Sequence, residues 1–347
     1  MHRLRLLLAL VIGHSSLLIA AHAADLPLVA LFTTGGTIQS KGTHRLTLAE
    51  YNDSVVPPDE LLADLPELKS LARIELTEIS NVGSGNIDAA RLLKLSKAIT
   101  AALARPEVAG AVITHGTSTL EETAFFLHLT VKSTKPVVVV GAMRPFTAIS
   151  RDGPYNLYNA VRVAATPDAV GKGALVVLND TIHSARYVTK GHTYHVETFV
   201  SRELGPLGFV DSDRVVFYRN PLTKHTATSE FDISALETLP MVDIVYGYQE
   251  ASAAPITALT EAGAKGIVYA DSSPAFNKAF LAAQAKGVTI VMSDRKGAGR
   301  VTLSDRVNAR NTITADNLNA QKARILLRLA LTKTTETRQL QRIFNEY

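Results

Sequence analysis

The stretch Thr33-Thr34-Gly35-Gly36-Thr37-Ile38 follows the apolar run Leu28 to Phe32, and it indicates how the chain folds. A second stretch, Thr114-His115-Gly116-Thr117-Ser118, follows the apolar run Gly110 to Ile113 in the same way. Both patterns are typical of a buried parallel strand that ends in a loop, and ligands bind at the carboxyl ends of such strands. Either turn alone also fits a tight turn with a helix-capping hydroxyl. The two together favour a site that uses threonine hydroxyl groups as nucleophiles.

Length and composition describe an ordinary globular protein of two domains. The chain has 347 residues, of which 46% are hydrophobic and 20% are charged. This length is large for one core and ample for two. Cysteine is absent, which excludes disulfides, thiolate nucleophiles and cysteine-bound metals.

Residues 1–23 have the pattern of a secretory signal peptide. Arg3 and Arg5 open an apolar stretch that runs to Ala21, and Ala21-His22-Ala23 fits a small-x-small cleavage site. Cleavage removes two cations and no acid, so the formal net charge falls from +4 to +2. A charge that small gives no case for binding nucleic acid or a membrane surface, and no second apolar run approaches the length of a membrane span. We expect a periplasmic or secreted protein.

Strand-type and helical patterns alternate along the larger, N-terminal part of the chain, residues 24–218. This alternation predicts an α/β fold with a mainly parallel sheet flanked by helices. Buried strands are expected at Leu28 to Thr33, Gly110 to Thr114, Pro136 to Val140 and Gly173 to Asn179. Helices are expected at Asp88 to Arg105, Leu120 to Val131 and Tyr155 to Ala165.

A smaller, flavodoxin-like α/β domain is predicted for residues 241–347. Residues 219–240 are polar, flanked by proline and without a long strand pattern, so we interpret them as a linker. In the second domain, strands are expected at Val242 to Tyr248, Gly266 to Ala270 and Val288 to Met292. Helices are expected around Ile256 to Ala262, from Asn277, from Asn319 to about Leu331, and towards Tyr347.

The chain resembles the bacterial type II L-asparaginases, of the asparaginase/glutaminase amidohydrolase family. The strings that carry the resemblance span nearly all of the chain after the signal peptide: TTGGTI, ITHGTSTLEETAFFL, KPVVVVGAMRP, DGPYNLYNAV, LNDTIHSARYVTK, GPLGF and LNAQKARILLRLALT. The resemblance implies hydrolysis of a side-chain amide to an acid and ammonia through an acyl-enzyme, which splits one difficult step into two easier ones. It also implies a homotetramer of close dimers, in which the neighbouring C-terminal domain completes each site. We expect no cofactor and no metal.

The resemblance also implies a role for each catalytic side chain. Thr37 is the nucleophile, and Tyr51 assists it from a mobile lid. Thr117 is the second catalytic threonine, with Lys190 beside it to lower the effective pKa of a hydroxyl or to move a proton. Backbone N–H groups near Thr37 and after Thr117 would hold the oxyanion. Without the resemblance, we would interpret Tyr51 as a surface aromatic residue and Lys190 as a solvated lysine.

Substrate contacts are expected from Ser84, Gly85, Gly116 and Ser118, and two of these depart from the family pattern. Gly85 stands where the family has glutamine or glutamate, and Ser118 stands where it has the aspartate that holds the substrate ammonium. Losing a carboxylate partner for a buried ammonium costs about 2–5 kcal/mol. Either another acid, such as Asp271, replaces it, or the substrate is not free L-asparagine.

The C-terminal domain departs from the family pattern as well. The family's Gly-x-Gly-Asn-type loop is replaced by the shorter Asp271-Ser272-Ser273-Pro274-Ala275. The family's glutamate that completes the threonine–tyrosine pair has no counterpart after Arg295-Lys296-Gly297. The groups that break the bond are therefore kept, while those that grip the charged end of an amino acid are reduced.

Three histidines and one glycine pair allow other interpretations. His192 and His195 form an H-x-x-H pair, but no acidic partner or glutamate-containing zinc motif accompanies it, so we expect exposed loop histidines. His115 is expected to have a hydrogen-bonded ring and not to act as a base. Gly35-Gly36 does not belong to a G-x-G-x-x-G nucleotide motif.

Three functions stay open from the sequence. The first is an asparaginase acting on L-asparagine. The second is the same chemistry on another amide, such as glutamine, a D-amino acid amide or a blocked asparagine. The third is a periplasmic solute-binding protein, which also has two α/β domains but needs neither twin threonines nor a partnered lysine.

Overall fold

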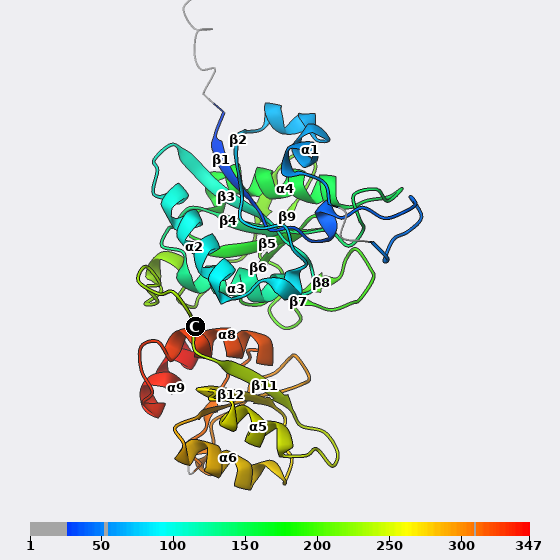
Figure 1. The fold of residues 1–347 in the computed structure, drawn as a ribbon. Helices are drawn as coiled ribbons and strands as arrows, with labels where there is room; N and C mark the ends of the chain where they lie inside the picture. Colours follow the sequence, from blue (N-terminus) through cyan, green and yellow to red (C-terminus); the bar gives the residue numbers. More distant parts are fainter. Residues whose placement is uncertain (1–25, 52–54, 309) are drawn as a thin grey trace, which may run out of the picture.

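The computed structural model describes residues 26–51, 55–308 and 310–347. These residues form two lobes, each built on a sheet with helices packed against it (Figure 1). The predicted signal peptide, residues 1–23, lies outside the described residues. Within the described part of the chain, no helix combines the length and apolarity needed to cross a membrane.

The larger lobe contains an eight-stranded, mainly parallel sheet, which confirms the predicted fold class. The strand order is β10-β9-β6-β5-β4-β3-β1-β2, and the five strands from β5 to β2 along this order are parallel. Their bounds are Leu28–Thr33 for β1, Arg73–Glu78 for β2, Val108–Thr114 for β3, Val137–Val140 for β4 and Ala174–Leu178 for β5. The sheet edge formed by β6, β9 and β10 is antiparallel (Thr181–Ser184, Gly208–Val210 and Val215–Phe217).

Helices cover both faces of this sheet (Figure 1). On one face, α2 (Ala89–Leu103) and α3 (Leu120–Thr130) pack against residues such as Phe32 and Ile113. On the other face, α4 (Gly153–Ala165) packs against residues such as Leu31 and Val112. Alternate residues of each strand therefore enter opposite cores, as expected for buried parallel strands. The short helix α1 (Pro58–Ala63) borders the second core through Leu61.

The smaller lobe contains a four-stranded parallel sheet of β11 (Val242–Tyr246), β12 (Gly266–Ala270), β13 (Thr289–Ser293) and β14 (Ile313–Thr314). This confirms the predicted α/β layering. The strands lie in chain order, so this sheet lacks the point at which the strand order of a flavodoxin sheet reverses. The helices of this lobe are α5 (Ala254–Glu261), α6 (Phe276–Ala285), α7 (Asp305–Asn308), α8 (Ala320–Ala330) and α9 (Thr337–Glu346).

Helix α8 lies between the two lobes (Figure 1). It packs on β11 and β12 of its own sheet and on α3 of the larger lobe. One hydrophobic core cluster consequently includes side chains of both lobes. Residues 219–240, predicted as a linker, contain only a short 3-10 turn (Thr226–Thr228), and Phe231, Ile233 and Leu239 are buried in the same cluster.

Candidate active site

The two threonine turns lie against each other at the carboxyl ends of the neighbouring strands β1 and β3. Gly36 has a φ of +90°, and a Cβ atom placed on it would lie 2.3 Å from Gly116 Cα. Both the backbone N–H and the hydroxyl of Thr34 donate to the carbonyl of Thr114, at 3.2 and 2.9 Å. Glycine at position 36 therefore allows the two backbones to touch, which brings their threonines to one place.

Thr37 is paired with Tyr51, as expected from the sequence. Thr37 begins a short 3-10 turn (Thr37–Gln39) and is 5% exposed. Its hydroxyl lies 2.7 Å from the Tyr51 hydroxyl, and either oxygen can be the donor. Tyr51 is 40% exposed, so its ring forms the solvent side of the pair.

Thr117 is paired with Lys190. The lysine comes from β7 (Thr189–Lys190), which forms a two-stranded ribbon with β8 (Phe199–Val200). Its ammonium donates to the Thr117 hydroxyl at 2.8 Å. Burial lowers the pKa of Lys190, which makes its neutral amine, a proton acceptor, more accessible near neutral pH. Each threonine thus has its own partner, one a phenol and one an amine.

His115 holds the second turn and does not face the cavity. Its Nδ1–H donates to the Gly116 carbonyl at 2.8 Å, and its Nε2 lies 2.9 Å from the Thr123 hydroxyl, which therefore donates to it. Burial lowers the pKa of His115 to about 4, so the ring is neutral at physiological pH. The expected hydrogen-bonded ring is confirmed.

His192 and His195 are exposed loop residues, as expected. Their rings stack with centroids 3.7 Å apart, and His192 Nδ1 accepts from the backbone N–H groups of Tyr194 and His195. Among the residues that the structure describes, no group of three or more histidine, cysteine or acidic side chains could hold a metal ion.

Thr37, Tyr51 and Thr117 line one cavity of about 410 Å³. Lys190 does not line it but borders a neighbouring hollow, which shares Ser118 with the cavity. The expected residues in its lining are Thr37, Tyr51, Ser84, Gly116, Thr117 and Ser118. The sequence did not point to Ser40, Asn81 and Asn86, which also line it. Asn81 and Asn86 follow β2, whose carboxyl end lies beside that of β1. No charged side chain belongs to this lining among the residues that the structure describes.

Comparison with known proteins places the chain in a family. A family model described as "Asparaginase, N-terminal" matches residues 28–223, and one described as "Glutaminase/Asparaginase C-terminal domain" matches residues 241–344. The chain belongs to the asparaginase family.

Several curated members of the asparaginase family match nearly the whole chain. "L-asparaginase 2" of Bacillus subtilis is 50% identical, with 94% of this chain and 88% of that protein covered. "L-asparaginase 2" of Escherichia coli is 43% identical, with 98% of each covered. The crystal structure of a "Probable Cytoplasmic L-asparaginase" from Campylobacter jejuni superposes with a TM-score of 0.89 at 42% identity, covering 92% of this chain and 100% of that one.

Two positions that depart from the family's sequence pattern differ in their surroundings. Ser118 is exposed and lines the cavity between the two threonine turns. Gly85 does not line it, but borders a separate hollow with Glu122 and Arg324. A Cβ atom on Gly85 would meet no atom within 4 Å, so a longer side chain has room there.

Asp271, the acid considered as a replacement for the missing carboxylate, is engaged within its own lobe. Lys296 donates to its carboxylate at 2.9 Å, and Arg295 Nε lies 3.1 Å from it. In this chain Asp271 therefore supplies no free negative charge to the cavity between the threonines.

Proposed function

We propose that this asparaginase-family chain hydrolyses the side-chain amide of L-asparagine to L-aspartate and ammonia through a threonyl ester. The observation that carries the proposal is the pair of buried threonine hydroxyls in one cavity, each with its own proton-handling partner. Relatives at 42–50% identity whose names contain asparaginase or glutaminase-asparaginase support the reaction class.

In the first step, Thr37 Oγ1 attacks the amide carbon, and its proton passes to the Tyr51 oxygen while the phenol proton moves on to the amide nitrogen. Backbone N–H groups of the two glycine-containing turns would stabilise the oxyanion that forms, which is usually the largest electrostatic contribution to such a step. The C–N bond then breaks, and ammonia leaves. In the second step, water attacks the ester carbon and passes one proton through Thr117 to the neutral amine of Lys190. The ester C–O bond then breaks, and the proton returns to Thr37 Oγ1 as L-aspartate leaves.

The test removes single hydroxyl groups without changing side-chain shape. Thr37→Val should lower the rate of ammonia release from L-asparagine by roughly 10³-fold or more, since deleting a nucleophile typically has this effect. The matched control is Thr33→Val at the end of β1, because Thr33 Oγ1 is buried and without a hydrogen-bond partner in the described structure. Thr33→Val should release ammonia at the wild-type rate. If Thr37→Val retains more than a tenth of wild-type turnover, the nucleophile is another residue.

The uncharged lining favours a second candidate substrate. A free amino acid carries an ammonium and a carboxylate, and neither finds a charged partner among the described residues that line the cavity. The same chemistry on a substrate without a free α-ammonium, such as N-acetyl-L-asparagine, would not need one. Rates of ammonia release from L-asparagine, L-glutamine, a D-amino acid amide and N-acetyl-L-asparagine, measured side by side, distinguish the two candidates.

A solute-binding role has less support. Such proteins close two lobes over a ligand, whereas here the lobes share one hydrophobic core through α3 and α8. Ammonia release by the purified chain would contradict a role limited to binding.

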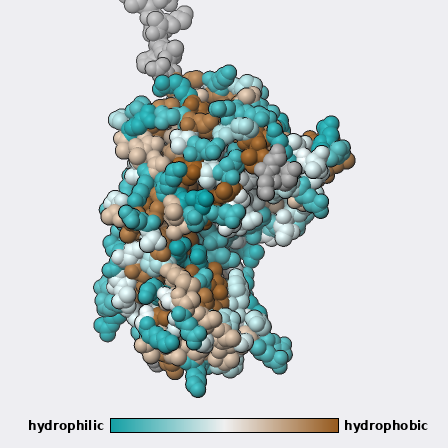
Figure 2. All heavy atoms as spheres, viewed as in Figure 1, coloured by the Kyte–Doolittle hydropathy of each residue, from teal (hydrophilic) through white to brown (hydrophobic). Residues whose placement is uncertain are grey.

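We also propose the assembly and location of a type II enzyme: a homotetramer, exported after cleavage behind Ala23. A second chain could supply the charges that the cavity lacks, and large apolar side chains such as Leu222 and Leu281 are exposed (94% and 62%). Hydrophobic residues remain visible on both lobes in Figure 2. Light scattering would test the assembly: a monomeric mass at full activity contradicts it. N-terminal sequencing of the exported protein would test the cleavage site.

A further inference from the structure

The segment that carries Lys190 is held by two buried polar side chains outside the cavity lining. The first is Glu121, in the first turn of α3, which is 7% exposed. One carboxylate oxygen accepts from the backbone N–H of Lys190 at 2.6 Å. The other accepts from the side-chain amide of Asn319 at 2.7 Å. Both oxygens of Glu121 are therefore engaged, one by each lobe.

Asn319 is the N-cap of α8 in the smaller lobe. Its side-chain oxygen accepts from the backbone N–H of Lys322 at 2.9 Å, so its NH₂ group is the part that faces Glu121. A capping side chain of this kind fixes both the start of the helix and its own orientation. The orientation of Glu121 is therefore tied to the position of α8.

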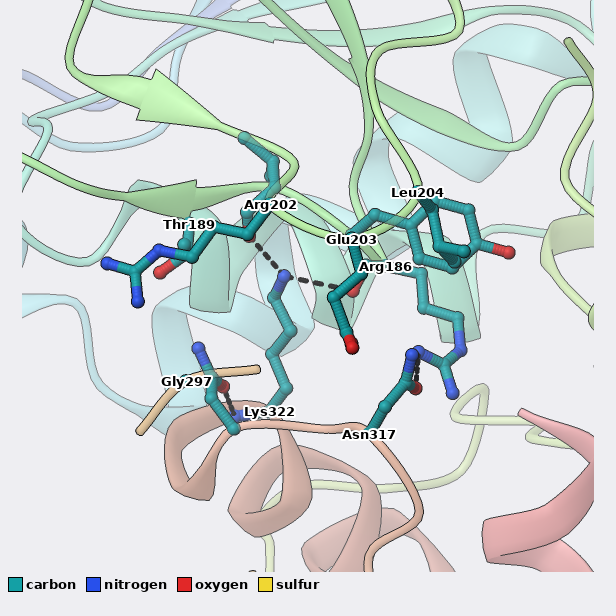
Figure 3. A pocket seen from close by; sticks show the side chains of 11 residues that line it. Arg186, Thr189, Arg202, Glu203, Leu204, Gly297, Asn317 and Lys322 are labelled. Carbon is teal, nitrogen blue, oxygen red and sulfur yellow. Dashed lines mark hydrogen bonds between the residues drawn. The ribbon is translucent and has the colours of Figure 1, made fainter. Parts of the chain in front are cut away.

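Lys322, one turn further along α8, is the second buried side chain and holds the same segment from below (Figure 3). It is 2% exposed, and its ammonium donates to the backbone carbonyls of Arg186, at 3.0 Å, and of Val188. Burial lowers the pKa of Lys322 to about 8, and Glu121 opposes this shift. The chain is consequently held at three points within five residues: the carbonyls of 186 and 188 and the N–H of 190.

We propose that Glu121 and Asn319 are positioning residues that fix Lys190 against Thr117. The inference rests on the proposed function, in which Lys190 acts at Thr117. A flexible lysine has many rotamers, and its ammonium stays 2.8 Å from the Thr117 hydroxyl only if its backbone is fixed. The smaller lobe thereby contributes to catalysis within the same chain, through the N-terminus of α8.

The test exchanges the hydrogen-bonding groups of the two side chains. In Glu121→Gln, the new amide offers one acceptor where two are needed. In Asn319→Asp, two carboxylates face each other. In the double variant, the amide at position 121 can accept from the Lys190 N–H and donate to the carboxylate at position 319. The second oxygen of that carboxylate still caps α8, and the formal charge equals that of the wild type.

Each single variant should lower kcat roughly 100-fold with KM changed less than about threefold, because small displacements of a catalytic group have effects of this size. The double variant should recover to within about tenfold of wild-type kcat. A merely structural role would not produce this recovery. Asp88→Asn, which alters the N-cap of α2, is the control for cap substitution in general and should leave kcat unchanged.

Asn319→Ser keeps a capping oxygen without adding a charge, so it tests the contact should Asn319→Asp fold poorly; it too should lower kcat. Wild-type turnover in Glu121→Gln and Asn319→Ser overturns the inference, as does a double variant no better than the worse single variant. Failure of the proposed function is distinguishable, because then the wild type itself releases no ammonia or Lys190→Met remains fully active.

Discussion

Thr37 and Thr117 have the same side chain, but the groups beside them differ in charge and in exposure. Tyr51 carries a phenol on the solvent side, while Lys190 is half-buried and its pKa is lowered by that burial. The phenol can exchange a proton with Thr37 without a change in net charge. The amine is suited to take one up from water. This difference supports the proposed roles of the two pairs in the formation and the hydrolysis of an ester, respectively.

Ser118 determines whether the cavity presents a negative charge. Ser118→Asp should lower KM about tenfold for amides with a free α-ammonium, because hydrogen bonds to charged groups contribute about 1.5–3 kcal/mol. The KM for N-acetyl-L-asparagine should not fall. Ser118→Asn, which matches the size of aspartate without its charge, is the control. An unchanged KM for L-asparagine in Ser118→Asp would mean that another acid, for instance from a second chain, already holds the ammonium.

Three of the four candidate catalytic residues could be predicted because they stand in recognisable strings, and Tyr51 was found by counting back from the family-like segment Asp59 to Leu68. Thr37, Thr117, Lys190 and Tyr51 were placed in this way, and the structure brings the four together in two pairs. Asn81 and Asn86 were missed because they follow β2, whose alternating exposed residues give no signal of a buried strand. Glu121 was missed as well. It looks like an ordinary acid in the first turn of a helix, and only the tertiary contact with Asn319 gives it a second function.

At the scale of elements, the decisive contact is that between the two glycine turns. Gly36→Ala would place its Cβ atom 2.3 Å from Gly116 Cα at a φ of +90°. Gly263→Ala is a matched control, since its φ is +87° and no described atom lies within 4 Å of the added Cβ. Left-handed backbone alone costs about 1–2 kcal/mol, so Gly263→Ala should lower the melting temperature slightly and keep turnover.

Gly36→Ala should lower the melting temperature further and reduce turnover, because the turns must separate. Thermal melts and ammonia release on both variants measure the difference. Equal effects in the two variants would show that the contact between the turns is dispensable.

Half of the strands and most of the helices in the described structure were predicted to within a few residues, since buried runs and helical periodicity mark them. The antiparallel edge of the large sheet was missed. Its hairpin from β5 to β6 turns at Asn179 and Asp180, whose φ angles are +49° and +60°, as in a type I′ turn. The pair Asn-Asp carries a weaker signal than Asn-Gly. The two-residue strands β7, β8 and β14 are too short for any periodicity to appear.

At the scale of the whole molecule, three buried histidines make stability depend on pH. Burial lowers the pKa of His115 and His183 to about 4, and that of His128 well below its usual range. Unfolded histidines titrate near pH 6.5. Below that pH the unfolded chain binds protons that the folded chain does not. Titration of these three histidines therefore leaves the free energy of unfolding unchanged above pH 6.5 and lowers it as the pH falls below that value.

The free energy of unfolding, measured by urea titration, should therefore fall between pH 6.5 and 5. The slope should approach about 1.4 kcal/mol per pH unit for each histidine. His183→Gln should lower this slope by the contribution of one histidine, whereas His195→Gln, at an exposed position, should leave the slope unchanged. A wild-type stability that is flat over this range would contradict the prediction.

The core that runs through α3 and α8 also has a consequence for folding. Side chains of both sheets, and those of residues 219–240, belong to one continuous cluster, so neither lobe can lose its structure without exposing the apolar face of the other. The molecule should then melt in one cooperative transition, with no intermediate in which one lobe is intact. A fragment cut after β10 would leave the outer face of α3 bare and prone to aggregation, although the family describes its two halves by separate models.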